Sequence, residues 1–85
     1  MKIITYSKDA LKVLRRMPKN ASLLIVSKIE QFASDPASLG NNLKPLKGRP
    51  GEFRLRVGDW RVIMTETGEI VSVIKIGPQG SVYED

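Results

Sequence analysis

The stretch PGEFRLRVGDWRVIM, residues 50–64, decides how this chain folds. Apolar and polar residues alternate on both sides of Gly58-Asp59, which is the period of a half-buried strand. Glycine at the first position of a two-residue loop is typical of a type II′ turn. The stretch therefore predicts a β-hairpin in which Val57 faces Trp60 across the turn.

The same register assigns the other residues of the hairpin to two faces, because cross-strand partners share a face. It pairs Leu55 with Val62 and Arg56 with Arg61. The apolar face collects Phe53, Leu55, Val57, Trp60, Val62 and Met64; the other face collects Arg54, Arg56 and Arg61, with Ile63 beside them. Like charges directly opposite each other destabilise a sheet, so folding gives no reason for three guanidinium groups. Two interpretations follow: a surface for a polyanion, or a solvated outer face that is basic.

Length and composition limit the classes of protein that this chain can belong to. Its 85 residues predict a single domain, residues 1–85, with one small core. There is no Cys and no His, which removes disulfides, thiolate metal sites and the commonest general acid-base group. No signal peptide and no membrane-spanning segment is evident. We expect a cytoplasmic protein that uses no cofactor and no metal and does not contact a membrane.

The positive charge is concentrated near the hairpin. The formal net charge is +5. The segment 44–61 holds six basic and two acidic residues, a net charge of +4, and the rest of the chain holds eight basic and seven acidic residues. A concentrated basic patch indicates a partner that carries phosphate or acidic groups. The basic residues of the segment are Lys44, Lys47, Arg49, Arg54, Arg56 and Arg61.

Before the hairpin, the pattern predicts a strand over residues 2–6 and two helices. Ser7 is a good N-cap for a helix from Lys8 to about Met17, whose apolar stripe is Ala10, Val13, Leu14 and Met17. Asn20 can cap a second helix over residues 21–34, whose stripe is Leu24, Ile25, Ile29 and Phe32. The short link between the helices predicts an antiparallel helical hairpin. Its basic residues are expected to be ordinary charges of a solvated surface.

The segments on either side of the hairpin complete the predicted fold. Residues 35–51 are rich in Pro and Gly and are expected to be a loop. Residues 70–76 are apolar on both faces apart from Ser72 and Lys75, which is typical of a central strand. The fold class is therefore α+β: an N-terminal strand, a helical hairpin and a three-stranded antiparallel meander, with the helices on one face of an antiparallel sheet.

Catalysis without His or Cys remains possible for one class of substrate. RNA supplies its own 2′-hydroxyl nucleophile, so a protein need only orient it, stabilise charge on the phosphate and move protons. Tyr83 could stack on a base or could anchor the tail. Trp60 could stack on a base, but its register favours the core. Lys75 could point to the basic face or merely snorkel, with its stem on apolar surface and its charge in water.

The residues LKG at 46–48 and EFRLRVGDWRVI at 52–63 resemble the RelE/ParE superfamily of toxins. That family has a leucine-lysine-glycine loop before a hairpin with basic residues, Gly-Asp, an aromatic residue and Arg-Val. The resemblance also covers the order of the helices, the strand that ends in Ile76-Gly77, and the trailing Val82-Tyr83. It implies a toxin of a type II toxin-antitoxin system with the RelE/ParE fold.

In the RelE branch, the resemblance implies a ribosome-dependent endoribonuclease that cuts mRNA and inhibits translation. The 2′-hydroxyl attacks the adjacent phosphate and leaves a 2′,3′-cyclic phosphate. Arg61, Tyr83 and Arg54 match the family's catalytic positions, with Tyr83 the tyrosine that stacks on a base or acts as general base. The RNA- and phosphate-binding residues are then Arg54, Arg56, Lys47, Arg49, Lys44 and Gln79.

The chain departs from the family pattern at Gln79. A basic residue is usual just after the last strand, where one is proposed to protonate the leaving oxygen, and glutamine cannot deliver a proton. Cleavage could therefore be slow or absent, and the alternative is a non-enzymatic binder that poisons DNA gyrase, as in the ParE branch, or that mainly binds its antitoxin. The expected partners are a cognate antitoxin, the ribosome with mRNA (alternatively gyrase), and operator DNA only through the antitoxin complex.

Overall fold

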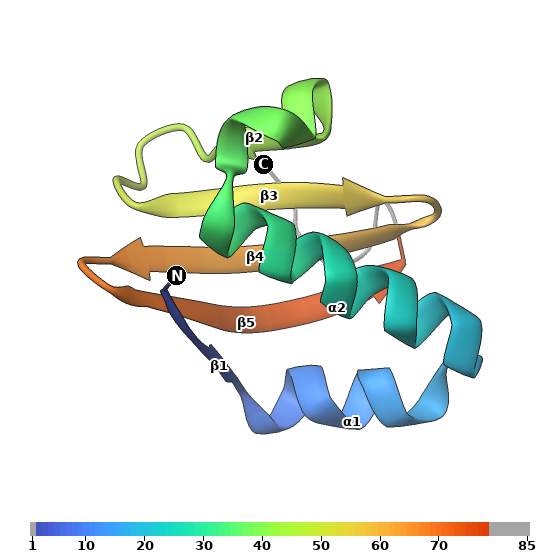
Figure 1. Ribbon diagram of the computed structural model, residues 1–85. Helices are drawn as coiled ribbons and strands as arrows, with labels where there is room; N and C mark the ends of the chain where they lie inside the picture. Colours follow the sequence, from blue (N-terminus) through green and yellow to red (C-terminus); the bar gives the residue numbers. More distant parts are fainter. Residues whose placement is uncertain (1, 79–85) are drawn as a thin grey trace.

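The computed structural model describes residues 2–78, which form five strands, two α-helices and a 3₁₀ helix (Figure 1). In chain order they are β1 (Ile3–Tyr6), α1 (Lys8–Arg16), α2 (Lys19–Ser34), η1 (Pro36–Asn42), β2 (Leu43–Pro45), β3 (Glu52–Val57), β4 (Trp60–Thr67) and β5 (Ile70–Pro78). No helix in this part of the chain is long and apolar enough to cross a bilayer. The predicted α+β class and order of elements are confirmed.

The strands form one sheet in the order β1-β5-β4-β3-β2. Three neighbouring pairs are antiparallel, but β1 pairs with β5 in parallel, so the sheet is mixed and not purely antiparallel as predicted. Ser7 supports the end of β1 in this arrangement. Its backbone N–H donates to Val73 O at 2.9 Å and its hydroxyl donates to Ile74 O at 2.6 Å, which fixes the end of β1 beside β5. The same hydroxyl accepts from the Ala10 N–H at 3.0 Å, which confirms Ser7 as the N-cap of α1.

The β3–β4 hairpin has the predicted register and turn. Val57 lies opposite Trp60, Arg56 opposite Arg61 and Leu55 opposite Val62. Gly58 has a φ of 58°, and no described non-glycine residue has a positive φ. A positive φ at the first central position alone distinguishes a type II′ turn from a type I′ turn. Local sequence rules therefore fix this element.

The two α-helices cover one face of the sheet, and the core lies between them. In Figure 1, α2 crosses the sheet diagonally. Phe32 of α2 packs against Phe53 of β3, with ring centroids 5.3 Å apart and planes inclined at 56°. The buried cluster joins the helices to the strands: Ala10, Leu14, Met17, Ile25, Ile29, Phe32, Ala33, Leu39, Leu55, Val57, Val62, Met64, Val71, Val73 and Ile76. Trp60 is half-buried against this cluster, as its register predicted.

The last strand, β5, lies between β1 and β4, as its apolar pattern predicted. Its pairing with β4 shifts between Ile63 and Met64, which lie opposite Lys75 and Val73. Ile74 is therefore an extra residue in β5, a β-bulge. Two residues lie between Val73 and Ile76, so regular alternation would put these side chains on opposite faces; the bulge lets both face the core and turns Lys75 to the other face.

Three local predictions were wrong. Residues 35–51 are not a simple loop, because η1 and β2 form within them and β2 pairs with β3 at the edge of the sheet. Asn20 does not cap α2, which begins at Lys19 after Pro18. Leu24 is not in the buried stripe: its side chain is 49% exposed, because Ile25, Ile29 and Phe32 already fill the face of α2 that meets the sheet.

Candidate phosphate-binding pocket

The strand register brings basic side chains together on the sheet face opposite the helices. Lys44 of β2 lies opposite Arg54 of β3, Arg54 lies opposite Ile63 of β4, and Ile63 lies opposite Lys75 of β5. This first row therefore contains three cations around one apolar residue. In the second row, Arg56 lies directly opposite Arg61.

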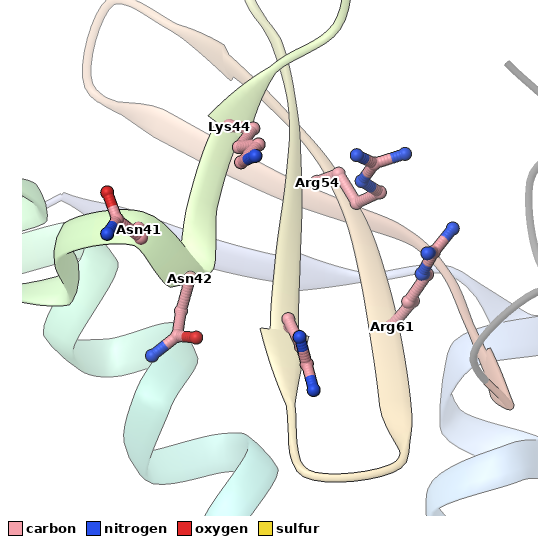
Figure 2. Close-up of a pocket in the computed structure, with 6 residues that line it drawn as sticks. Asn41, Asn42, Lys44, Arg54 and Arg61 are labelled. Carbon is pink, nitrogen blue, oxygen red and sulfur yellow. The ribbon is translucent and has the colours of Figure 1, made fainter.

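Alternation along the strands shows that these rows face away from the core. Leu55 and Val57 flank Arg56 in β3 and are buried in the core, as is Val62 beside Arg61. The side chains of Arg54 and Arg61 extend from neighbouring strands in the same general direction (Figure 2). The three arginines are thus on one surface, as predicted. Lys75 is exposed on the same surface, which settles its position.

Four of these cations line one open pocket of about 200 Å³. Its lining residues are Asn41, Asn42, Lys44, Arg54, Arg56 and Arg61. Since one water occupies roughly 30 Å³ of liquid, the pocket has room for a phosphate with part of its sugar. Asn41 and Asn42 lie on one side of the group drawn in Figure 2, with Arg54 and Arg61 on the other. The 3₁₀ helix η1 supplies the two asparagines, and β2, β3 and β4 supply the cations.

Lys44, Arg56 and Arg61 of the pocket form no ion pair with an acidic side chain of residues 2–78. Two ion pairs within residues 2–78 lie elsewhere: Lys2 Nζ to Glu66 Oε2 at 3.0 Å and Arg49 Nη1 to Glu52 Oε1 at 3.8 Å. Guanidinium groups stay protonated at all ordinary pH values. Arg56 and Arg61 therefore repel each other across the hairpin and favour a bound anion, whose charge relieves this repulsion.

The remaining predicted site residues are not all part of this pocket. Lys47 and Arg49 are exposed in the turn before β3 and do not line it, and Arg49 interacts with Glu52. Gln79 and Tyr83 lie outside the described residues. Within residues 2–78, no group of three or more acidic, His or Cys side chains could hold a metal ion.

Sequence reasoning missed Asn41 and Asn42. Both residues fall in the segment 35–51 that the sequence predicts to be a loop, and polar residues in loops are common. The signal that could have found them is the pairing of Leu43 with Leu55, since extending β2 alongside β3 brings the residues before Leu43 to the arginines. That pairing depends on contacts distant in sequence.

The comparisons with known proteins agree with this fold. Residues 4–83 match the family described as the ParE toxin of the type II toxin-antitoxin system parDE. No curated protein matches the sequence. Among solved structures, the archaeal RelE–RelB complex from Pyrococcus horikoshii OT3 has a chain that superposes with a TM-score of 0.80 at 21% identity, covering 94% of this chain and 97% of that one.

Two bacterial structures are similar with somewhat lower TM-scores. The intact Escherichia coli RelBE toxin-antitoxin complex matches with a TM-score of 0.75 at 18% identity, over 92% of this chain and 96% of that one. The YoeB dimer from Staphylococcus aureus matches with a TM-score of 0.71 at 18% identity, over 87% and 92% of the two chains. Identities this low establish a shared fold, and the family match extends over nearly the whole chain. The chain therefore belongs to the ParE toxin family of type II toxin-antitoxin systems, within the RelE/ParE superfamily.

Proposed function

We propose that this toxin is a ribosome-dependent endoribonuclease that cuts mRNA and thereby inhibits translation. The observation that supports the proposal most strongly is the open pocket in which Lys44, Arg54, Arg56 and Arg61 converge. A ribose-phosphate backbone is a ligand that matches such a set of donors, because arginine binds phosphate through two parallel hydrogen bonds.

The proposed reaction uses the nucleophile of the substrate. The 2′-hydroxyl oxygen forms a bond to the adjacent phosphorus, the bond from phosphorus to the 5′ oxygen breaks, and the products are a 2′,3′-cyclic phosphate and a 5′-hydroxyl. The hydroxyl proton goes to a base, and the leaving oxygen takes up a proton. Arg61 and Arg54 stabilise the negative charge that develops on the phosphate, and removal of one such donor costs about 10²–10³ in rate in well-studied enzymes.

Other residues have supporting roles in this proposal. Arg56 and Lys44 bind the RNA backbone in the pocket, and Lys47 and Arg49 attract the RNA from the adjoining turn. Tyr83 orients or deprotonates the 2′-hydroxyl. Gln79 contacts the RNA but has no proton to give to the leaving oxygen, so we expect cleavage to be slow.

The test is mRNA cleavage on ribosomes that carry a defined message. We expect Arg61→Ala to lower the cleavage rate by about 10²–10³, and Gln79→Arg to raise it, because a cationic donor then assists the leaving oxygen. Arg15→Ala is a matched control, since Arg15 is an exposed arginine of α1 on the helix side of the sheet. A message that stays intact at high toxin concentration, with wild type and Arg61→Ala alike, would exclude the nuclease.

A second candidate function is inhibition of DNA gyrase without cleavage. The name of the matched family, ParE, favours it, and so does the absence of a proton donor at Gln79. A supercoiling assay distinguishes the two candidates. Loss of gyrase activity together with intact mRNA would support the second and contradict the first.

Both candidates include a cognate antitoxin as the partner that keeps the toxin inactive. RelE chains from Pyrococcus horikoshii and Escherichia coli were solved in complexes with RelB antitoxins, which supports this expectation. We expect the antitoxin to place acidic groups near Arg54, Arg56 and Arg61, and the complex to bind operator DNA through the antitoxin. Purification from native cells should recover such a partner, and recovery of the toxin alone would count against it.

A further inference from the structure

We propose that Lys75 of β5 binds a second phosphate of the RNA backbone, next to the phosphate in the pocket, so that the bound strand crosses the sheet from β2 to β5. The inference rests on the proposed function in one respect, since it takes the polyanion to be single-stranded RNA. It adds a binding residue outside the pocket and gives the direction in which the RNA lies.

The β-bulge in β5 puts Lys75 on the pocket face. Val73 faces the core, and regular alternation along a strand would turn residue 75 to the core as well. The extra residue Ile74 shifts this alternation by one position, and bulges commonly redirect a side chain in this way. Ile76 is therefore buried in the core, and Lys75 is exposed on the opposite face.

Lys75 continues the cations of the pocket across the sheet. It lies opposite Ile63, which in turn lies opposite Arg54. Arg61 comes two residues before Ile63 in β4, so Arg61 and Lys75 are diagonal neighbours on one face, about 7–8 Å apart and within reach of long side chains. We call the cations of this face the cation band, which extends over β2, β3, β4 and β5: Lys44, Arg54, Arg56, Arg61 and Lys75.

The residues on either side of the cation band determine its direction. Toward the start of β3, the next row on this face has one carboxylate, three hydroxyl groups and no cation: Glu52, Thr65, Ser72 and Thr5. At the other end of β3, the hairpin closes at Gly58-Asp59, which adds a second carboxylate. RNA lying along the strands would leave the cations within a few residues. RNA lying across the strands meets a cation on each of them.

The length of the cation band exceeds that of the pocket. Neighbouring strands are about 4.8 Å apart, so the distance from β2 to β5 is roughly 14 Å. The pocket lies over β2, β3 and β4 and has room for one phosphate with part of its sugar, and Lys75 does not line it. A strand that leaves the pocket beside Arg61 therefore reaches Lys75 with its next phosphate.

The Lys75 side chain is suited to this role. It is exposed and forms no ion pair with an acidic side chain of residues 2–78. A lysine ammonium binds phosphate as a point charge on a flexible stem, so it needs no fixed orientation before the RNA arrives.

The experiment measures binding of the toxin alone to the trinucleotide UpUpU, in competition with a fluorescent uridine oligomer at one low salt concentration. The comparison ligands are the same trinucleotide with each phosphodiester in turn replaced by a neutral methylphosphonate, which removes one charge and keeps the length. We expect wild type to bind UpUpU roughly fivefold more tightly than either analogue, the upper end of the range for an exposed ion pair. Lys75→Ala should remove most of this difference and leave the affinity for the analogues unchanged.

Two further variants serve as controls. Lys75→Arg keeps the charge and should keep the difference between UpUpU and the analogues. Lys12→Ala removes an exposed lysine of α1, on the helix side of the sheet, and should behave as wild type.

The other outcomes would overturn the inference. If Lys75→Ala weakened UpUpU and the analogues equally, Lys75 would act through the structure or the overall charge. If wild type bound UpUpU and the analogues equally, or bound none of them, there would be no second phosphate site. If Lys75→Ala kept the difference but weakened binding of a short polyglutamate peptide, Lys75 would serve an acidic protein partner instead. None of these results decides the nuclease proposal, which depends on cleavage of mRNA on ribosomes.

Discussion

Arg56 and Arg61 face each other across β3 and β4, where like charges cost stability. A cross-strand pair contributes about 0.2–1 kcal/mol, so one repulsive pair is a small cost for a domain stable by roughly 5–15 kcal/mol. In return, the pair favours anion binding, because the charge of a bound anion relieves the repulsion between the two guanidinium groups. At the scale of single residues, the sequence predicted this pair because a two-residue turn fixes the register over a few positions. It could not predict that Asn42 lines the pocket, because this depends on the pairing of β2 with β3, a strand that begins ten residues later.

Tyr6 is the residue for which pH should matter. Burial raises the pKa of its phenol above the usual value of about 10, and the nearby Glu30 carboxylate adds to the shift. Below pH 10 the phenol is neutral in both the folded and unfolded states. Above about pH 10 the unfolded state loses the proton first, so the free energy of unfolding should fall by up to about 1.4 kcal/mol per pH unit until the folded protein also titrates.

The measurement is urea unfolding on either side of pH 10 for wild type and Tyr6→Phe. The variant should lose this part of the alkaline destabilisation, because phenylalanine has no proton to lose. Tyr83→Phe is the control, since the other tyrosine of the chain is changed. Equal alkaline destabilisation of wild type and Tyr6→Phe would show that Tyr6 does not cause it.

At the scale of elements, the sequence correctly predicted the features that depend on residues close together in the chain. The hairpin, the cap at Ser7 and the stripe of α1 were correct because each depends on residues within a turn or two. Non-local pairing decided the rest. The edge strand β2 has three residues and forms by pairing with β3, and β1 pairs in parallel with β5, where Ser7 adds a hydrogen bond to Ile74 O. The bulge at Ile74 explains why β5 looked apolar on both faces.

The β3–β4 turn should be sensitive to a single methyl group. A Cβ built on Gly58 meets no atom within 4 Å, so substitution by alanine adds no clash with the rest of the fold. The penalty comes only from the positive φ of 58°, a conformation that costs a non-glycine residue about 1–3 kcal/mol. We expect Gly58→Ala to lower the free energy of unfolding in urea by that amount. Asp59→Ala, which changes the neighbouring residue at negative φ, should have a smaller effect, and equal effects of the two changes would contradict the proposed turn strain.

At the scale of the whole molecule, the sheet separates two groups of positive charge. Lys44, Arg54, Arg56, Arg61 and Lys75 lie on one face. The residues Lys8, Lys12, Arg15, Arg16 and Lys19 are exposed around α1, which packs against the other face through Ala10 and Leu14. Total charge alone would make both groups attract RNA. If the pocket is the binding site, only the cations on the pocket face should bind phosphates closely enough to release counterions.

The salt dependence of RNA binding distinguishes these two situations. For single strands, the plot of log affinity against log salt has a slope of about −0.7 for each phosphate that a cation neutralises. We expect Arg56→Ala to make the slope less steep by roughly 0.7, whereas Lys12→Ala on α1 should leave the slope of wild type, because Lys12 contacts no RNA when the strand occupies the pocket. If both variants changed the slope equally, RNA would be responding to the overall charge of +5 and not to a site. That result would remove the reason for assigning separate roles to the pocket arginines, since any exposed cation would then serve equally well.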